Sequence, residues 1–408
     1  MLFRSPVAWP VAVPFLLLWS ASPLVARAIS VPWRASPTEP LTPADAQALR
    51  LIARRTWRFF STFVGPEDHA LPPDNFQESP SPVVAHRTSP TNMGLYLLSI
   101  VAAHDFGWLG ALDAVERLEA TLGAMSGLER FRGHFFNWYD TRDCRPLNPR
   151  YVSSVDSGNL AGQLLALKQA CLEKIGRQSL GRAALLGIGD AALLVRDSAR
   201  ALDESRRPRT ATRLPLDDAL DTVTATLERV PETPAEWARR LAELAAQART
   251  VSALARDLAE KDGAGAQAEV VLWARALGAT IESHIRDLDV SEPLIDRLAL
   301  LARSAQATVE AMEFAFLFDP MRQLFALGYR VEDGSLDSGR YDLLASEARL
   351  TSFVAIAKRD VPVSHWFRLG RALTPVEQDS ALVSWSGSMF EYLMPGLEIG
   401  RASCRERV

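Results

Sequence analysis

Helix signals recur along this chain, whereas the alternation of polar and apolar residues that marks β-strands is scarce. Thr42-Pro43 followed by Asp45 combines an N-cap, a proline at the first helical position and an acid in the first turn, which predicts a helix to about Phe63. Further helices are predicted near Thr91 to His104, Leu109 to Met125 and Gly158 to Ile175. The pattern predicts an all-α protein.

The composition fits a globular domain and excludes several functional classes. With 408 residues, 48% hydrophobic and 23% charged, the chain is neither disordered, collagen-like nor a coiled-coil rod. Its formal net charge of −4 gives no field that would attract nucleic acid. Cys144, Cys171 and Cys404 stand at unrelated spacings, so neither a disulfide framework nor a zinc site is predicted, and a reducing compartment is indicated. The scattered histidines give no reason to expect a metal.

An uncharged run from Ser5 to Ala26 is about the ~20 residues needed to cross a bilayer core, which predicts a transmembrane helix over residues 6–29. A signal peptide is the alternative, but the run is long for its apolar region and lacks a lysine-rich start. Arg27 and Arg34 follow closely, so the positive-inside rule predicts that the rest of the chain lies on the cytoplasmic side.

The two ends carry a different signal. Residues 1–5 and 398–408 match translations of common sequencing-adapter DNA. We therefore expect residues 398–408 to be a non-native tail, and the chain to be an internal fragment of a longer protein.

Residues 174–312 hold only two aromatic residues, Trp237 and Trp273. This change in composition predicts that they form a helical insert or arm. The main domain would then consist of a first part at residues 40–173 and a second part at residues 313–397. Thr233-Pro234-Ala235-Glu236 is a capping box at the start of a helix. Spacings of three and four then define its apolar stripe: Trp237, Leu241, Leu244, Ala248, Val251, Ala255 and Leu258. No chemistry is assigned to this insert.

The aromatic segment from Gly133 to Asp140 suits a carbohydrate cleft. Aromatic faces cover the C–H faces of a sugar ring, while Asn, Asp and His side chains bind its hydroxyls. His134, Trp138, Tyr139 and Asp140 are the candidates here. A buried aromatic core with a polar exit is the alternative.

Two further acids have both a functional and a structural interpretation. Asp156 precedes a helix predicted to begin near Leu160 and could serve as its N-cap, yet five polar or small residues crowd this turn, so some of them are expected to face a ligand. Ser388-x-x-Glu391 is itself a capping box, which favours a structural role for Glu391.

Glu347 is the most informative acid. Helical spacing would put it on one stripe with Leu343, Leu350 and Val354, so that a carboxylate interrupts an apolar face. Burial raises the pKa of a carboxyl group, which is the property that a glycosidic general acid needs. The alternative is a glutamate paired with a nearby arginine.

Six strings resemble the central glucoamylase-like domain of the cyclic β-1,2-glucan synthases of Gram-negative bacteria, together with the last membrane span before it. The resemblance covers about residues 6–397 and is weakest through 174–312. The strings are DNFQE (74–78), HRTSPTN (86–92), LERFRGHFFNWYDTRD (128–143), YVSSVDSGNLAG (151–162), YDLLASEARL (341–350) and SWSGSMFEYLMP (384–395).

The resemblance implies an (α/α)6-barrel, a toroid of paired helices, that closes linear β-1,2-glucan into a ring by retaining transglycosylation. Glu347 aligns with one of the two catalytic carboxylates of the family. The residues expected to line the cleft and bind the glucan are Asp140, Asp156, Glu391, His134, Trp138, Tyr139, Tyr341 and Trp385. An endo-β-1,2-glucanase on the same scaffold and a non-catalytic, membrane-anchored glucan-binding scaffold are the alternatives.

The resemblance also implies a location and partners. The family consists of bacterial inner-membrane proteins in which a neighbouring glycosyltransferase builds the glucan from UDP-glucose and a phosphorylase-like domain trims it. No cofactor is expected for the present domain. The second catalytic carboxylate lies beyond the SWSGSMFEYLMP string in the family, so this chain alone is expected to be inactive.

Overall fold

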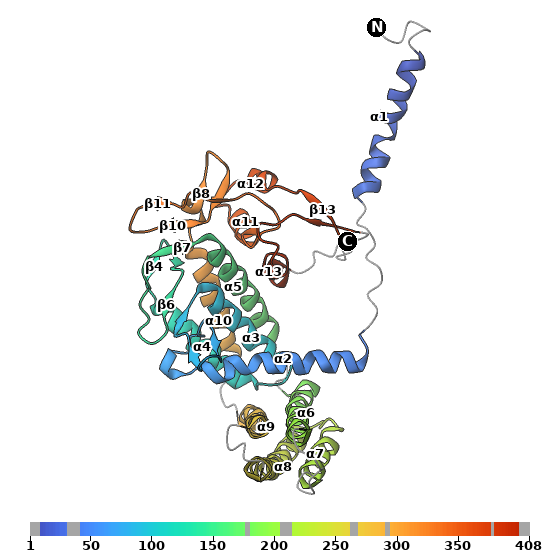
Figure 1. Cartoon of the computed structure of the whole chain (residues 1–408), viewed down its shortest axis with the longest axis vertical. Helices are drawn as coiled ribbons and strands as arrows, with labels where there is room; N and C mark the ends of the chain where they lie inside the picture. Colours follow the sequence, from blue (N-terminus) through green and yellow to red (C-terminus); the bar gives the residue numbers. More distant parts are fainter. Residues whose placement is uncertain are drawn as a thin grey trace. The chain divides into compact units, whose positions relative to one another are not determined.

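The computed structural model describes residues 9–30, 41–175, 180–204, 214–261, 268–289, 294–376 and 379–399. Most of the tail expected to be non-native, residues 400–408, lies outside this range, as does Cys404. The chain divides into two compact units, Met1–Leu49 and Arg50–Val408. The described residues are mostly helical (Figure 1).

The first unit contains α1 (Trp9–Ser30) and the start of α2 (Pro43–Phe63). The bounds of α2 confirm the prediction, and Thr42 Oγ1 accepts a hydrogen bond from Asp45 N at 3.1 Å as an N-cap should. A helix does form where a membrane span was predicted. However, none of the helices in the described ranges combines the length and the apolar character that crossing a membrane requires, so the span over residues 6–29 is not supported there.

In the second unit, α5 (Ser154–Lys174) is the central helix of the main hydrophobic core. It packs against α3, α10, α11 and α13 (Figure 1). The remaining helices of this part are α3 (Pro90–Asp105), α4 (Ala111–Gly127), α10 (Leu294–Ala311), α11 (Arg349–Ala357), α12 (Ser364–Arg368) and α13 (Met389–Ile399). These helices do not establish a closed ring, so the (α/α)6-barrel stays a prediction.

Glycines on α5 let α11 approach closely. A Cβ atom at Gly158 would lie 2.1 Å from Thr351 Oγ1 and 2.5 Å from the Thr351 backbone, and one at Gly162 would lie 2.7 Å from a Leu350 methyl carbon. The same approach lets Thr351 Oγ1 donate to the Ser154 carbonyl at 2.7 Å. The position of α11, and of the turn that leads into it, is therefore fixed by α5.

The insert forms a second hydrophobic core of its own. Its capping box is confirmed, because Glu236 N donates to Thr233 Oγ1 at 3.2 Å and Thr233 N donates to Glu236 Oε2 at 3.3 Å. The predicted apolar stripe from Trp237 to Leu258 is buried. The helices of the insert are α6 (Arg182–Glu204), α7 (Leu214–Leu227), α8 (Pro234–Lys261) and α9 (Glu269–Arg286), followed by the 3-10 helix η5 (Asp287–Asp289).

The insert ends earlier than the predicted boundary at residue 312. Helix α10 lies before that boundary, yet it packs on α4 and α5 and belongs to the main core. Composition misplaced the boundary because α10 buries leucine and alanine, like the insert, and has no aromatic residue. The insert is attached to the main core through Asp287, whose carboxylate accepts from the free N–H groups of Ala111 and Leu112 at the start of α4, each at 2.9 Å.

Short antiparallel strands correct the all-α prediction. They were missed because segments of two to four residues are too short to show alternation. The strands are β1 (Phe76–Gln77), β2 (Val83–Val84), β3 (Arg87–Thr88), β4 (Arg130–Phe131), β5 (His134–Phe135), β6 (Tyr139–Asp140), β7 (Tyr151–Ser153), β8 (Phe318–Asp319), β9 (Leu324–Ala326), β10 (Gly328–Arg330), β11 (Ser335–Leu336), β12 (Arg340–Tyr341), β13 (Leu373–Val376) and β14 (Asp379–Leu382).

The pairing of β7 with β10 matters most for the site. Ser153 lies opposite Gly328, and Tyr151 lies opposite Arg330. This pairing joins the segment that enters α5 to the segment that leads toward Glu347, although the whole insert separates them in sequence.

Candidate functional site

Glu347 lies in a turn just before α11, which begins at Arg349, and not on the predicted helical stripe. Upstream of it, Leu343 forms a bridge with Gly370, and Ala345 forms one with Ser384. These tertiary bridges keep the chain extended up to the turn and so prevent a helix there. The prediction for Leu350 and Val354 does hold, because both are buried on α11.

The Glu347 carboxyl group is half-buried and has acidic neighbours. Burial raises its pKa, and the nearby Glu391 and Asp156 carboxyl groups raise it further. Within the described residues it has neither a hydrogen-bond partner nor an ion-pair partner, so the alternative of a glutamate neutralised by an arginine is wrong there. A carboxyl group with these properties can keep a proton and deliver it to a bound ligand.

Asp156 lies in the first turn of α5 but is not its N-cap. That role belongs to Ser153, whose Oγ accepts from Asp156 N at 3.2 Å. The Asp156 carboxylate accepts from Thr91 Oγ1 at 2.7 Å. With the amide of Asn137 oriented to satisfy its neighbours, Asn137 Nδ2 donates to the other Asp156 oxygen at 2.8 Å. Burial raises the pKa of Asp156, and the hydrogen bond from Thr91 opposes this.

A buried amide supports this arrangement from behind. Asn159 has no exposed surface, and its Nδ2 donates to Thr91 Oγ1 at 3.2 Å. A chain of donors therefore runs from Asn159 through Thr91 to Asp156. Sequence reasoning did not single out Thr91, Asn137 or Asn159 as site residues, although all three lie within the strings that carry the resemblance.

Tyr341 and Trp385 form an aromatic surface beside Glu347. Their ring centroids are 5.3 Å apart with an interplanar angle of 32°. Trp385 Nε1 donates to Asp342 Oδ1 at 2.9 Å, which holds the indole while 47% of Trp385 stays exposed. Burial, followed by the charge of Glu347, raises the pKa of Tyr341. An exposed, anchored indole next to a carboxyl group suits the apolar face of a sugar.

Glu391 is held as the capping box predicts. Ser388 Oγ accepts from Glu391 N at 3.2 Å, and the Glu391 carboxylate accepts from Ser388 N at 3.1 Å, from Ser386 Oγ at 2.8 Å and from Ser384 Oγ at 3.0 Å. Burial would raise the pKa of Glu391, but these donors outweigh it and lower the pKa. Glu391 therefore keeps its negative charge, which in turn favours the protonated form of Glu347.

His134 and Tyr139 were predicted to bind substrate, but neither side chain has any exposed surface. His134 Nδ1 pairs with Ser157 Oγ at 2.9 Å, and burial lowers the His134 pKa to about 3. The Tyr139 hydroxyl donates to the Glu129 carbonyl at 2.6 Å and accepts from Phe136 N at 2.8 Å. For these two residues the buried aromatic core is the correct interpretation, and direct contact with a glucan is not available to them.

Trp138 and Asp140 lie on the same segment and remain half-buried. Trp138 Nε1 donates to the Asn137 amide oxygen at 3.0 Å, so it helps to hold the amide that contacts Asp156. The Arg87 guanidinium stacks over the Trp138 ring, with Cζ 4.7 Å from the ring centroid. Asp140 Oδ1 accepts from Arg142 N at 2.8 Å. No group of metal-ligating side chains is found in the described parts of the chain.

No protein-family model matches the chain. The chain is 44% identical over 392 residues to the cyclic β-(1,2)-glucan synthase NdvB of Rhizobium meliloti (strain 1021). A solved structure, described as a "putative glucoamylase" from Bacteroides fragilis, shares 18% sequence identity with this chain, with a TM-score of 0.28. The aligned part covers 39% of this chain and 38% of that structure, and this likeness is too low to support a conclusion about the fold. The match to the synthase covers 95% of this chain, which spans 14% of the length of that relative.

Proposed function

We propose that this chain is the domain that closes linear β-1,2-glucan into a ring by retaining transglycosylation, with Glu347 as one of the two catalytic carboxyl groups. The half-buried, unpaired Glu347 carboxyl group is the observation that carries the proposal. The identity to a stretch of a cyclic β-(1,2)-glucan synthase supports the substrate class. The (α/α)6-barrel belongs to the same proposal.

The reaction proceeds in two steps. A carboxylate attacks the anomeric carbon of an internal linkage while an acid protonates the departing glycosidic oxygen, which gives a glycosyl ester on the enzyme. The hydroxyl at the non-reducing end of the same glucan then attacks the ester and gives its proton to the acid residue, now acting as a base. The bond energy of the linkage is conserved, so no cofactor is needed, and exclusion of water favours transfer over hydrolysis.

The surroundings of Glu347 suit this role. The charged Glu391 and the Asp156 carboxyl group disfavour ionisation of Glu347, and the exposed Trp385 indole offers a face for one glucose ring. The chain of donors from Asn159 through Thr91 holds the Asp156 carboxylate, whose charge acts on Glu347.

Product analysis with linear β-1,2-glucan tests the proposal in the complete native gene product. Cyclic glucans support it, whereas linear oligosaccharides favour the endo-β-1,2-glucanase and binding without turnover favours the scaffold. Glu347→Gln should lower the rate about 10²- to 10⁴-fold and spare glucan binding, because it removes the proton donor and keeps the side-chain shape. Glu260→Gln, on an exposed position of α8, is the matched control. Full activity of Glu347→Gln contradicts the proposed role.

We also propose that the domain is anchored at the bacterial inner membrane and lies on its cytoplasmic side, with the other domains of a full-length synthase as neighbours. Exposed apolar side chains on α1 support the anchoring: Phe15, Leu17, Leu18, Trp19, Leu24 and Val25. The proposed UDP-glucose-dependent synthesis of the linear glucan belongs to those neighbouring domains.

A further inference from the structure

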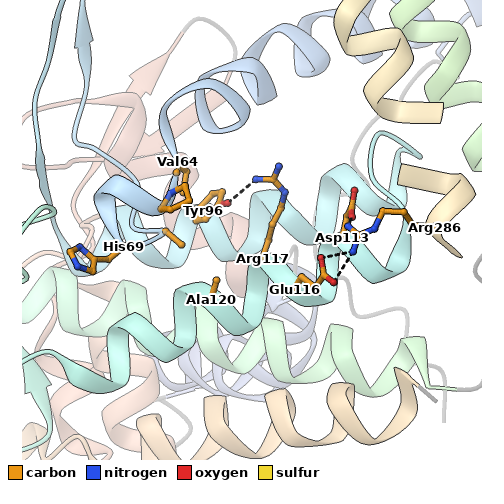
Figure 2. A pocket seen from close by; sticks show the side chains of 11 residues that line it. Val64, His69, Tyr96, Asp113, Glu116, Arg117, Ala120 and Arg286 are labelled. Carbon is orange, nitrogen blue, oxygen red and sulfur yellow. Dashed lines mark hydrogen bonds and ion pairs between the residues drawn. The ribbon is translucent and has the colours of Figure 1, made fainter. Parts of the chain in front are cut away.

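Figure 2 shows the residues that line a further cavity. Its volume is about 590 Å³, and its lining includes none of the residues described around Glu347 and Asp156. It forms where the segment that follows α2 meets α3, α4 and the last residue of α9, so both the main core and the insert contribute to its wall. Its volume falls within the range of sites for small molecules. None of its lining residues takes part in the proposed glucan chemistry.

The charges around the cavity are unevenly matched. Arg286 pairs with Asp113 through Nη1, and its Nη2 lies 2.8 and 2.9 Å from the two carboxylate oxygens of Glu116. These three residues together keep one negative charge at one end of the cavity. Figure 2 shows them grouped apart from Arg117, which rises from α4 toward Tyr96.

Arg117 has no carboxylate partner within the described residues. Its Nη1 contacts the Tyr96 hydroxyl at 3.4 Å, which is long for a hydrogen bond to an arginine. A guanidinium group carries five N–H donors, so most of its capacity is open toward the cavity. Tyr96 is only 1% exposed, and burial raises its pKa, so its hydroxyl keeps its proton.

Most of the wall beyond Arg117 is apolar, and the exposed His69, whose Nδ1 pairs with the Thr141 carbonyl at 2.9 Å, is the polar exception. Val64 and Pro66 come from the residues that follow α2, and Ala120 comes from the next turn of α4. One open cation beside a mostly apolar wall matches a ligand with one negative head and a short hydrocarbon body. A second negative charge would be repelled by the net charge of Asp113, Glu116 and Arg286.

We propose that this cavity binds a small organic monoanion, a carboxylate on a short apolar body, through the Arg117 guanidinium. Butyrate is the probe, and isothermal titration calorimetry of the 408-residue chain is the measurement. We expect saturable binding with a Kd of about 1–10 mM, as suits a ligand with so few atoms. Neutral butanamide and dianionic phosphate should bind more weakly.

Two variants locate the binding. Arg117→Gln removes the charge and should weaken butyrate about tenfold or more, the usual cost of losing a hydrogen bond to a charged group. Ala120→Leu fills the cavity from an exposed position of α4 and should also abolish saturation. Arg249→Gln, exposed on α8, is the matched control and should bind like the wild type.

Three results would overturn this inference. They are the absence of saturable butyrate binding by the wild type, unchanged butyrate binding in a folded Arg117→Gln or Ala120→Leu variant, and phosphate binding as tight as that of butyrate. Circular dichroism of each variant shows that it is folded. Both substituted positions are at least partly exposed on α4, so either variant can decide the question if the other fails to fold.

Discussion

Replacing Gly158 by alanine tests whether the close contact of α5 with α11 positions the site. The new Cβ atom would lie 2.5 Å from the Thr351 backbone, and ordinary contacts begin at 3.4 Å, so α11 must move by about 0.9 Å. Overpacking of this kind costs about 1–3 kcal/mol. Alanine also favours the helix by about 0.5–1 kcal/mol over glycine. We therefore expect Gly158→Ala to lower the free energy of unfolding by up to about 2.5 kcal/mol.

Gly123→Ala is the control, because a Cβ atom at Gly123 on α4 would meet nothing within 4 Å. Here only the helix preference changes, so the free energy of unfolding should rise by about 0.5–1 kcal/mol. Urea unfolding followed by circular dichroism measures both variants. The displacement of α11 would also shift Glu347, two residues before the helix. In the complete native gene product, Gly158→Ala should therefore lose cyclising activity while Gly123→Ala keeps it.

Equal stability of Gly158→Ala and Gly123→Ala would contradict this expectation. In that case the two helices separate without cost, and the glycines of α5 do not determine where Glu347 lies. If Gly158→Ala lost stability but kept its activity, the two helices would be tightly packed there, but this packing would not determine the position of Glu347.

Two further predictions concern pH and location. The His134 pKa of about 3 lies below its usual 6.5, so the stability that neutral His134 contributes is complete above pH 6.5 and is lost as the pH falls toward 3, by up to about 1.4 kcal/mol per pH unit. Imidazole NMR signals that show protonated His134 in the folded protein at pH 5 contradict this. If α1 anchors the protein, deleting residues 9–30 should move it from the membrane pellet to the supernatant after ultracentrifugation, and an unchanged distribution would remove the proposed anchor.

Elements with local signals could be predicted from the sequence. The start of α2 at Pro43 and that of α8 at Pro234 follow from caps and first-turn acids within four residues. The buried stripe of α8 follows from its spacing alone. The structural role of Glu391 could also be predicted, because Ser388-x-x-Glu391 is a local capping-box pattern.

Features that depend on distant contacts could not be predicted. The turn at Glu347 exists because Leu343 and Ala345 bridge to residues far along the chain, and a helical pattern does not reveal such bridges. By residue type, the N-cap of α5 could be Ser153, Ser154 or Asp156. Ser153 is the N-cap because β7 ends at this residue, where it pairs with β10. Thr91 contacts Asp156 across 65 positions, so no spacing rule could have joined them.

The separate core of the insert also bears on how the main core assembles. Helices α5 and α10 pack together although the insert lies between them in the sequence, and bringing such distant segments together costs chain entropy that grows with the length of the loop. Because α6 and α9, the first and last helices of the insert, pack on each other, early folding of the insert would tie its ends and shorten that loop. Each halving of the effective length lowers the closure cost by about 0.6 kcal/mol. The insert can thus speed the meeting of α5 and α10 without contributing a side chain to it.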